Sequence, residues 1–172
     1  EQELTSAPYI EGYILKVDQT KQKEAADAAD AEARRFEEGA KYARAELKSD
    51  KSILTLSPEQ LNDKRNNYEG KRFHTVLTVN RVRNNNFTAK LEKDKWGDSF
   101  YCYFDREIDL RNHLKKGDAV ELIGTIKPGS SNCKDYTSCE IISIGEEAQK
   151  VLTAIIKEQK SATKKEPVKK QE

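Results

Sequence analysis

The 172-residue sequence contains no methionine, one tryptophan, two histidines, three cysteines and four prolines. It has no apolar run near the roughly 18 residues that a membrane-spanning helix needs, so no transmembrane segment is predicted. With 35% charged residues and a mean hydropathy of -0.90, the chain is predicted to have a folded core smaller than its full length.

Motifs of catalysis and metal binding are also missing. Neither His74 nor His113 lies beside a nucleophile in a known catalytic pattern, and neither has finger-like spacing to the cysteines. The glycines form no phosphate-binding loop and no dinucleotide fingerprint. The carboxylates of "DREID" (105–109) are typical of a solvated helix face. We therefore predict a protein that is not an enzyme and that uses no cofactor and no metal.

The net charge of +1 is unevenly distributed along the chain. It is -4 over residues 1–50, zero over 51–69, +3 over 70–145 and +2 over 146–172. A charge of +3 on the predicted core is only mildly basic, so any non-specific affinity for nucleic acid should be modest.

The chain begins at Glu1 without a methionine. We interpret this as the removal of a leader, which predicts an exported protein with a signal peptide, either periplasmic or anchored to the membrane as a lipoprotein. A cytoplasmic protein is the alternative. In an oxidising compartment Cys133 and Cys139 could form a loop disulfide, or Cys102 could face Cys139 if their strands are neighbours. Three buried, reduced cysteines are the other possibility.

Residues 1–55 are predicted to form an N-terminal extension with a long helix rich in alanine. Residues 9–17 have the composition of a strand, whereas residues 18–48 are rich in strong helix formers. Apolar residues in this helix recur at alternating spacings of three and four, at Ala26, Ala29, Ala33, Phe36, Ala40, Ala43 and Leu47. This seam could pack on the rest of the chain, mediate self-association or bind a partner helix, or belong to a solvated spacer.

Residues 56–145 are predicted to form a five-stranded barrel. A short helix begins with Ser57 as its N-cap and Pro58 in its first turn, and should end near residue 66 or 67. Strands are expected over 71–82, 87–92, 99–104, 119–126 and 136–144, with a turn at 83–86 whose residues suit positive φ. A short helical stretch over 105–114 separates the third strand from the fourth. Residues 146–160 are predicted to form a C-terminal helix, and 161–172 a disordered charged tail.

Five strands with a helix between the third and the fourth is the order of an OB-fold, a small Greek-key barrel. The predicted fold class is therefore mainly β with flanking helices. Strands in so narrow a barrel bend sharply, and Gly124 is predicted to relieve crowding inside the fourth strand.

The segment from Leu56 to Ile144 resembles the bacterial OB-fold proteins called tRNA_anti-like. The resemblance rests on "NNYEGKRF", "CYF", "LKKGDAVELIGTI" and "SCEI". It implies an exported protein, often a lipoprotein, with a nucleic-acid role inferred from the fold. One departure is that the first strand reads "VLTVNRV" where such proteins often place a glycine, so its bend should differ.

The predicted ligand surface is the outer face of the second and third strands with its flanking loops. Alternation places Phe87, Ala89, Leu91, Phe100, Cys102 and Phe104 inside the barrel. The ligand-binding residues predicted on the outer face and its rim are Arg81, Arg83, Thr88, Lys90, Lys95, Trp96, Tyr101, Tyr103, Lys127 and Lys134.

Two functions are compatible with this surface. The first is a protein-interaction module in the cell envelope, which uses the barrel face or the helix seam. The alternative is a single-stranded nucleic-acid binder, in which aromatic rings stack bases while lysines and arginines neutralise phosphates. Nearby acidic residues would weaken the second function, and exposed tyrosines and threonines are common on any sheet.

Overall fold

The computed structural model describes residues 7–63, 68–91, 100–128 and 134–163. The chain divides into two compact units, Glu1–Glu37 and Glu38–Glu172. Within the described ranges, no helix combines the length and the hydropathy required of a membrane span.

The first unit consists of the N-terminal part of one long helix, α1 (Ala7–Ser49). Residues 9–17 belong to this helix, so the expectation of strand character there is wrong. Their β-branched and aromatic side chains give only a weak β preference, which the helix overrides. Along the predicted seam, Ala26, Ala29 and Ala33 are exposed.

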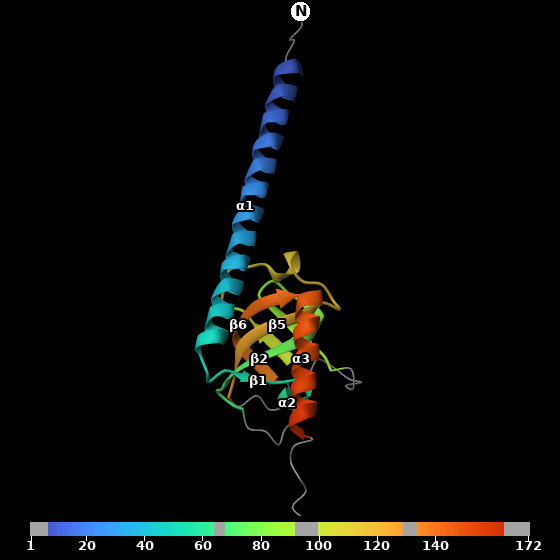
Figure 1. Ribbon diagram of the computed structural model, residues 1–172. Coiled ribbons are helices and arrows are strands. Elements are labelled where there is room, and N and C mark those ends of the chain that lie inside the picture. The colour runs from blue at the N-terminus through green and yellow to red at the C-terminus, as the bar shows by residue number, and fades with distance from the viewer. Residues whose placement is uncertain (1–6, 64–67, 92–99, 129–133, 164–172) are drawn as a thin grey trace, which may run out of the picture. The chain divides into compact units, whose positions relative to one another are not determined.

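The second unit is a closed barrel built mainly from five strands (Figure 1). These are β2 (Arg72–Val82), β3 (Asn86–Ala89), β4 (Phe100–Tyr103), β5 (Ala119–Ile126) and β6 (Lys134–Ile144). Neighbours follow the order β2-β3-β4-β6-β5, β4 and β6 pair in parallel, and the antiparallel pairing of β2 with β5 closes the barrel. The predicted OB-fold is confirmed.

Short elements flank the barrel. The two-residue strand β1 (Leu54–Thr55) adds to β2 in parallel and was not predicted. Helix α2 (Pro58–Asn62) has the predicted start, because Ser57 and Gln60 form a capping box, but it ends earlier than expected. Between β4 and β5 the expected helical stretch is reduced to the 3-10 turn η1 (Leu110–Asn112). Helix α3 (Glu146–Thr163) is three residues longer than predicted.

The barrel interior is filled by aromatic and aliphatic side chains. The ring of Tyr136 lies 4.5 Å from that of Phe73 and 5.7 Å from that of Phe100, measured between centroids, and all three residues are fully buried. Phe87 is also fully buried, whereas Phe104 is only half-buried and lies 5.8 Å from the Phe87 ring. The residues predicted to face inward are therefore fully buried at the centre of the barrel, whereas Phe104 at its rim is only half-buried.

Gly124 lies where β5 and β6 crowd each other. The register between these strands shifts near Ile123 and Thr125. A Cβ at Gly124 would lie 3.0 Å from the Cys139 sulfur and 3.2 Å from two carbons of the Phe73 ring. This crowding agrees with the predicted role of the glycine, because a side chain here would require Cys139 or Phe73 to shift by a few tenths of an ångström.

The turn between β2 and β3 lies where it was expected but has a different conformation. Among the described residues, the only non-glycine residue with a positive φ is Ser138, so the asparagines of the turn do not use that region. The carbonyls of Asn84 and Asn85 accept hydrogen bonds from the amides of Leu110 and Phe104 instead. In β2 itself, a register irregularity between Val79 and Arg81 supplies the bend for which the sequence has no glycine.

Two helices cover the outer face of β2, β5 and β6. Ala43 of α1 is fully buried with Ile53, Ile123 and Ile142, and Leu47 packs against this cluster. On the other side, Ala148 and Ile155 of α3 pack against Val76 and Ala119. Ala43 and Leu47 of the predicted seam therefore pack on the barrel, which is one of the three interpretations. The seam alanines before residue 37 are exposed.

Candidate nucleic-acid interface

The outer face of β3 and β4 carries two cross-strand rows of polar side chains. In the first row, Arg81 of β2 pairs with Thr88 of β3, which pairs with Tyr101 of β4. On the far side of Tyr101 the row continues to Asp135 of β6, whose carbonyl accepts a 2.9 Å hydrogen bond from the amide of Lys127. Arg81 therefore begins the row, Tyr101 lies within it, and the backbone of Lys127 lies beside its other end.

The second row lies two residues farther along each strand than the first. The Arg83 amide donates to the Asn86 carbonyl at 2.8 Å, and Asn86 pairs with Tyr103. Tyr103 is 37% exposed, and Arg83 is exposed as well. Positions two apart in a strand are separated by about 6.6 Å, so the two tyrosines present rings in succession along one face.

Thr88 is less exposed than predicted. It is on the predicted face but only 5% exposed. Its register neighbours Arg81 and Tyr101 are much longer, so a threonine between them does not reach solvent. Within the described part of the chain, its hydroxyl oxygen is buried without a hydrogen-bond partner. Thr88 therefore belongs to the floor of the face.

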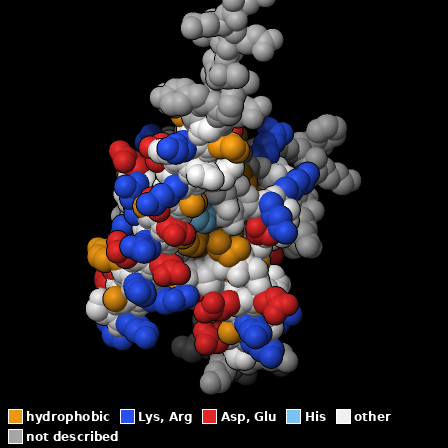
Figure 2. Space-filling model, turned by 90° about the horizontal axis from the view of Figure 1, so that it is seen from above, with side chains coloured by type: hydrophobic (Ala, Val, Ile, Leu, Met, Phe, Trp, Pro, Cys, Tyr) orange, Lys and Arg blue, Asp and Glu red, His pale blue; other side chains and the backbone are white. Residues whose placement is uncertain are grey.

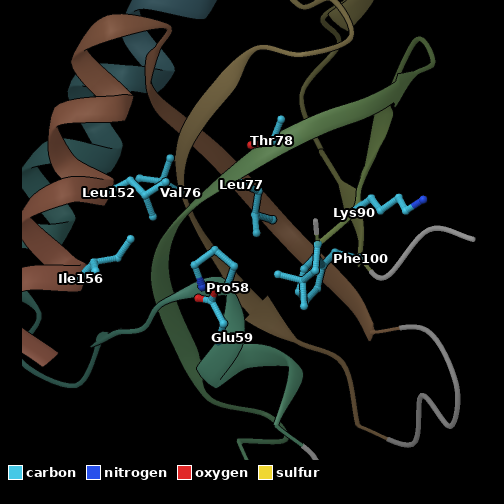
Figure 3. Close-up of a pocket in the computed structure, with 10 residues that line it drawn as sticks. Pro58, Glu59, Val76, Leu77, Thr78, Lys90, Phe100, Leu152 and Ile156 are labelled. Atoms are coloured by element: carbon cyan, nitrogen blue, oxygen red, sulfur yellow. The ribbon is translucent and has the colours of Figure 1, made fainter. Parts of the chain in front are cut away.

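Lys90 extends the face along β3 toward a pocket. The cavity of about 230 Å³ is lined by Pro58 and Glu59, by residues 76–78 of β2, by Lys90, Leu91 and Phe100, and by Leu152 and Ile156 of α3. Figure 3 shows that these side chains come from α2, α3 and the barrel strands, with Lys90 on the side away from α3. Its walls are apolar and its polar groups are few, as in small-molecule sites. We call it the β3 pocket.

Three predicted site residues are not placed by the structure. Lys95 and Trp96 lie outside the described residues, as does Cys133. Lys134 is in β6, where its backbone pairs with Phe100, but the structure does not describe its side chain. The structure thus brings together Arg81, Arg83, Thr88, Lys90, Tyr101, Tyr103 and the backbone of Lys127.

The charge around the face is mixed. Figure 2 shows Lys and Arg side chains interleaved with Asp and Glu on the side seen from above, without a field of one sign. At the face itself, Asp135 lies in the first row, and Asp105 follows β4 and accepts a hydrogen bond from the Ser138 hydroxyl at 2.8 Å. A surface of mixed charge gives only weak long-range attraction for a polyanion.

A buried polar chain crosses the opposite side of the barrel. The Nε2 atom of His74 lies 2.9 Å from a carboxylate oxygen of Glu121, whose other oxygen accepts a 2.6 Å hydrogen bond from the Ser143 hydroxyl. The Thr55 hydroxyl lies 3.2 Å from Nδ1 of the same imidazole. Burial raises the pKa of Glu121, but hydrogen bonds from His74 and Ser143 outweigh it, and the net direction is down. Sequence reasoning singled out His74 but missed its partners, because only strand pairing places β5 and β6 beside it.

The remaining predicted sites have structural roles where they are described. Asp109 of "DREID" caps η1 and pairs with Arg111, which lowers the pKa of its carboxyl. Cys102 and Cys139 are buried free thiols on neighbouring strands, and burial raises the pKa of Cys102. Among the described residues, no group of histidine, cysteine and acidic side chains is arranged to hold a metal.

Comparisons with known proteins identify no family. No family model matches the sequence, and a search of curated proteins finds no match. The chain is similar in structure to a chain in the crystal structure of the S. pombe Stn1-Ten1 complex, with 16% identity and a TM-score of 0.40 over 65% of this chain and 95% of that one. A similarity at this level says nothing about what the present chain binds. Membership of the tRNA_anti-like family is not supported, whereas the OB-fold stands on the strand topology.

Proposed function

We propose that this protein binds single-stranded nucleic acid, without catalysis, on the outer face of β3 and β4. The observation that carries the proposal is the pair of cross-strand rows, in which Arg81 is in register with Tyr101 and Arg83 with Tyr103. Each row offers a ring for a base and a guanidinium for a phosphate, and base-ring stacking contributes about 1–3 kcal/mol per base.

The charge distribution supports a single strand over a duplex. Arg81, Arg83 and Lys90 lie on the face with the rings, the backbone of Lys127 lies at its edge, and acidic residues lie among these four cationic residues. A duplex binder relies on a broad positive field, whereas stacking needs exposed bases. The expected binding is modest in affinity and tolerant of sequence.

The test is a fluorescence-anisotropy titration of labelled 12-nucleotide DNA and RNA strands at about 50 and 200 mM salt. If all four cations contact phosphates, this change of salt should weaken binding by about fifty-fold. Tyr103→Ala should weaken it by about tenfold or more through the loss of one stacking ring.

Tyr42→Ala is the matched control, because Tyr42 is a 55% exposed tyrosine that belongs to α1 and not to β3 or β4. Arg34→Ala provides the same control for Arg81→Ala, since Arg34 is exposed in the first unit. The proposal is wrong if no oligonucleotide binds at low salt, or if a Tyr101→Ala/Tyr103→Ala variant binds as the wild type does.

A second candidate function is protein interaction through α1. Ile14 and Leu15 are 52% and 62% exposed, and they precede a seam whose alanines before residue 37 are also exposed. An apolar contact of this kind tolerates added salt, so the same salt series distinguishes it from nucleic-acid binding.

Export and lipid anchoring are proposals from the sequence alone, and fractionation of cells that express the full-length gene tests them.

A further inference from the structure

We infer that the β3 pocket receives one base of the bound strand and prefers a base that carries an exocyclic amino group. This inference rests on the proposed function, because the pocket is taken to hold part of the same ligand.

The pocket shares Lys90 with the proposed interface. Along β3, Asn86 lies in the row of Tyr103, Thr88 lies in the row of Tyr101, and Lys90 follows at the mouth of the pocket. Alternation places these three residues on one face at steps of about 6.6 Å. A strand that stacks on the two tyrosines and continues along β3 therefore reaches Lys90 and the pocket next.

The size and lining of the pocket suit one heteroaromatic ring. A dry cavity of about 150 Å³ lined by Leu, Ile and Phe binds benzene, so the 230 Å³ available here accommodates a larger ring. Leu77 and Phe100 are buried at its floor, and Leu152 and Ile156 form its α3 side (Figure 3). These apolar groups can cover the faces of a base removed from water.

The preference for a base with an amino group comes from the polar residues at the rim of the pocket. Lys90 offers an ammonium group to a phosphate, while Glu59 offers a carboxylate, which accepts hydrogen bonds and cannot donate them. Carboxylates recognise the N4 amino group of cytosine in this way. A base with a carbonyl at the same position would place two acceptors against each other.

The experiment compares 12-nucleotide strands of deoxycytidine and deoxyuridine on the full chain, because cytosine has a 4-amino group beside a bare N3, whereas uracil has a 4-carbonyl beside an N3–H. At about pH 7.5 the cytidine strand should bind about tenfold more tightly, as expected for one hydrogen bond to a charged group. Glu59→Gln should remove this difference, because an amide can donate to the uracil carbonyl. Glu158→Gln on the exposed side of α3 is the control.

A second variant tests the pocket without changing charge. Ile156→Trp fills the cavity from α3 and should lower the affinity for the cytidine strand to that for the uridine strand. Ala154→Trp adds the same indole at an exposed position of that helix and should change neither affinity. Equal binding of the two strands by the wild type overturns the pocket inference alone, as does a preference that survives both pocket variants. Failure of the wild type to bind either strand overturns the proposed function as well.

Discussion

At the scale of a single residue, the strictest packing requirement is at Gly124. A Gly124→Ala substitution would place its methyl group against Cys139 and Phe73 at the distances described above. Overpacking of a full core costs about 1–3 kcal/mol, so we expect the free energy of unfolding, measured with urea, to fall by that amount.

Two variants show whether contact is the cause. Cys139→Ala removes the nearest atom, so Gly124→Ala should cost less in that background. Gly12→Ala lies in the helix with nothing within 4 Å, where alanine is the better helix former and should be neutral or stabilising. An unchanged cost in the Cys139→Ala background would contradict the packing explanation.

Glu121 should make folding stability depend on pH. Its pKa is lowered in the folded protein, so its stabilising contribution is present above the ordinary glutamate value of 4.5 and is lost as the pH falls through the lower, folded value. Glu121→Gln should reduce the free energy of unfolding by about 2 kcal/mol at pH 7.

The pH effect is read from urea unfolding of wild type and variant at several pH values between 7 and about 3. The gap between the two proteins should narrow on the acid side. A gap that is constant over this range would show that the carboxylate charge has no role in the buried chain of Thr55, His74, Glu121 and Ser143. Glu158→Gln is the exposed control and should leave stability almost unchanged.

At the scale of elements, the seam of α1 has alanine both at buried positions and at exposed ones. Ala43 is fully buried on the barrel, whereas Ala33 is exposed. Ala43→Asp places an unpaired charge among Ile53, Ile123 and Ile142 and should destabilise the protein by at least about 2–3 kcal/mol. Ala33→Asp should cost only a few tenths of that, through helix propensity. Thermal unfolding of both variants provides the measurement, and equal losses would contradict the packing of α1 described here.

The attachment of α1 also depends on groups that the heptad pattern does not contain. Arg72 pairs with Glu46, which lowers the pKa of that carboxyl, and Arg44 donates a 3.0 Å hydrogen bond to the Ile142 carbonyl. Gly39 lies close to the ion pair of Arg106 and Glu140, so a larger residue there would push on it. A seam of small residues allows a close approach, and these charged contacts fix the position.

At the scale of the whole molecule, sequence reasoning predicted the barrel well and its surface less completely. β-branched and aromatic residues bounded by turn residues located all five barrel strands. Alternation alone would not have done so, because β3 and β5 are buried along almost their whole length. β1 was missed because two residues are too few for a periodic pattern. The buried floor position of Thr88 depends on which residues neighbour it across two strands, and the pocket depends on packing of α2 and α3 against the barrel. Neither relation is visible in a single segment.

The closing pair of strands has a consequence for how the molecule forms. Arg72 pairs with Thr125 and Thr78 with Ala119, so β2 cannot complete its hydrogen bonds until a segment about 50 residues later is available. Contacts of such long range are typical of folding in milliseconds to seconds. On the ribosome, at about 5–20 residues per second, the edge of β2 waits roughly 3–10 s for its partner. During synthesis, this edge of β2 is therefore open to aggregation and to capture by chaperones.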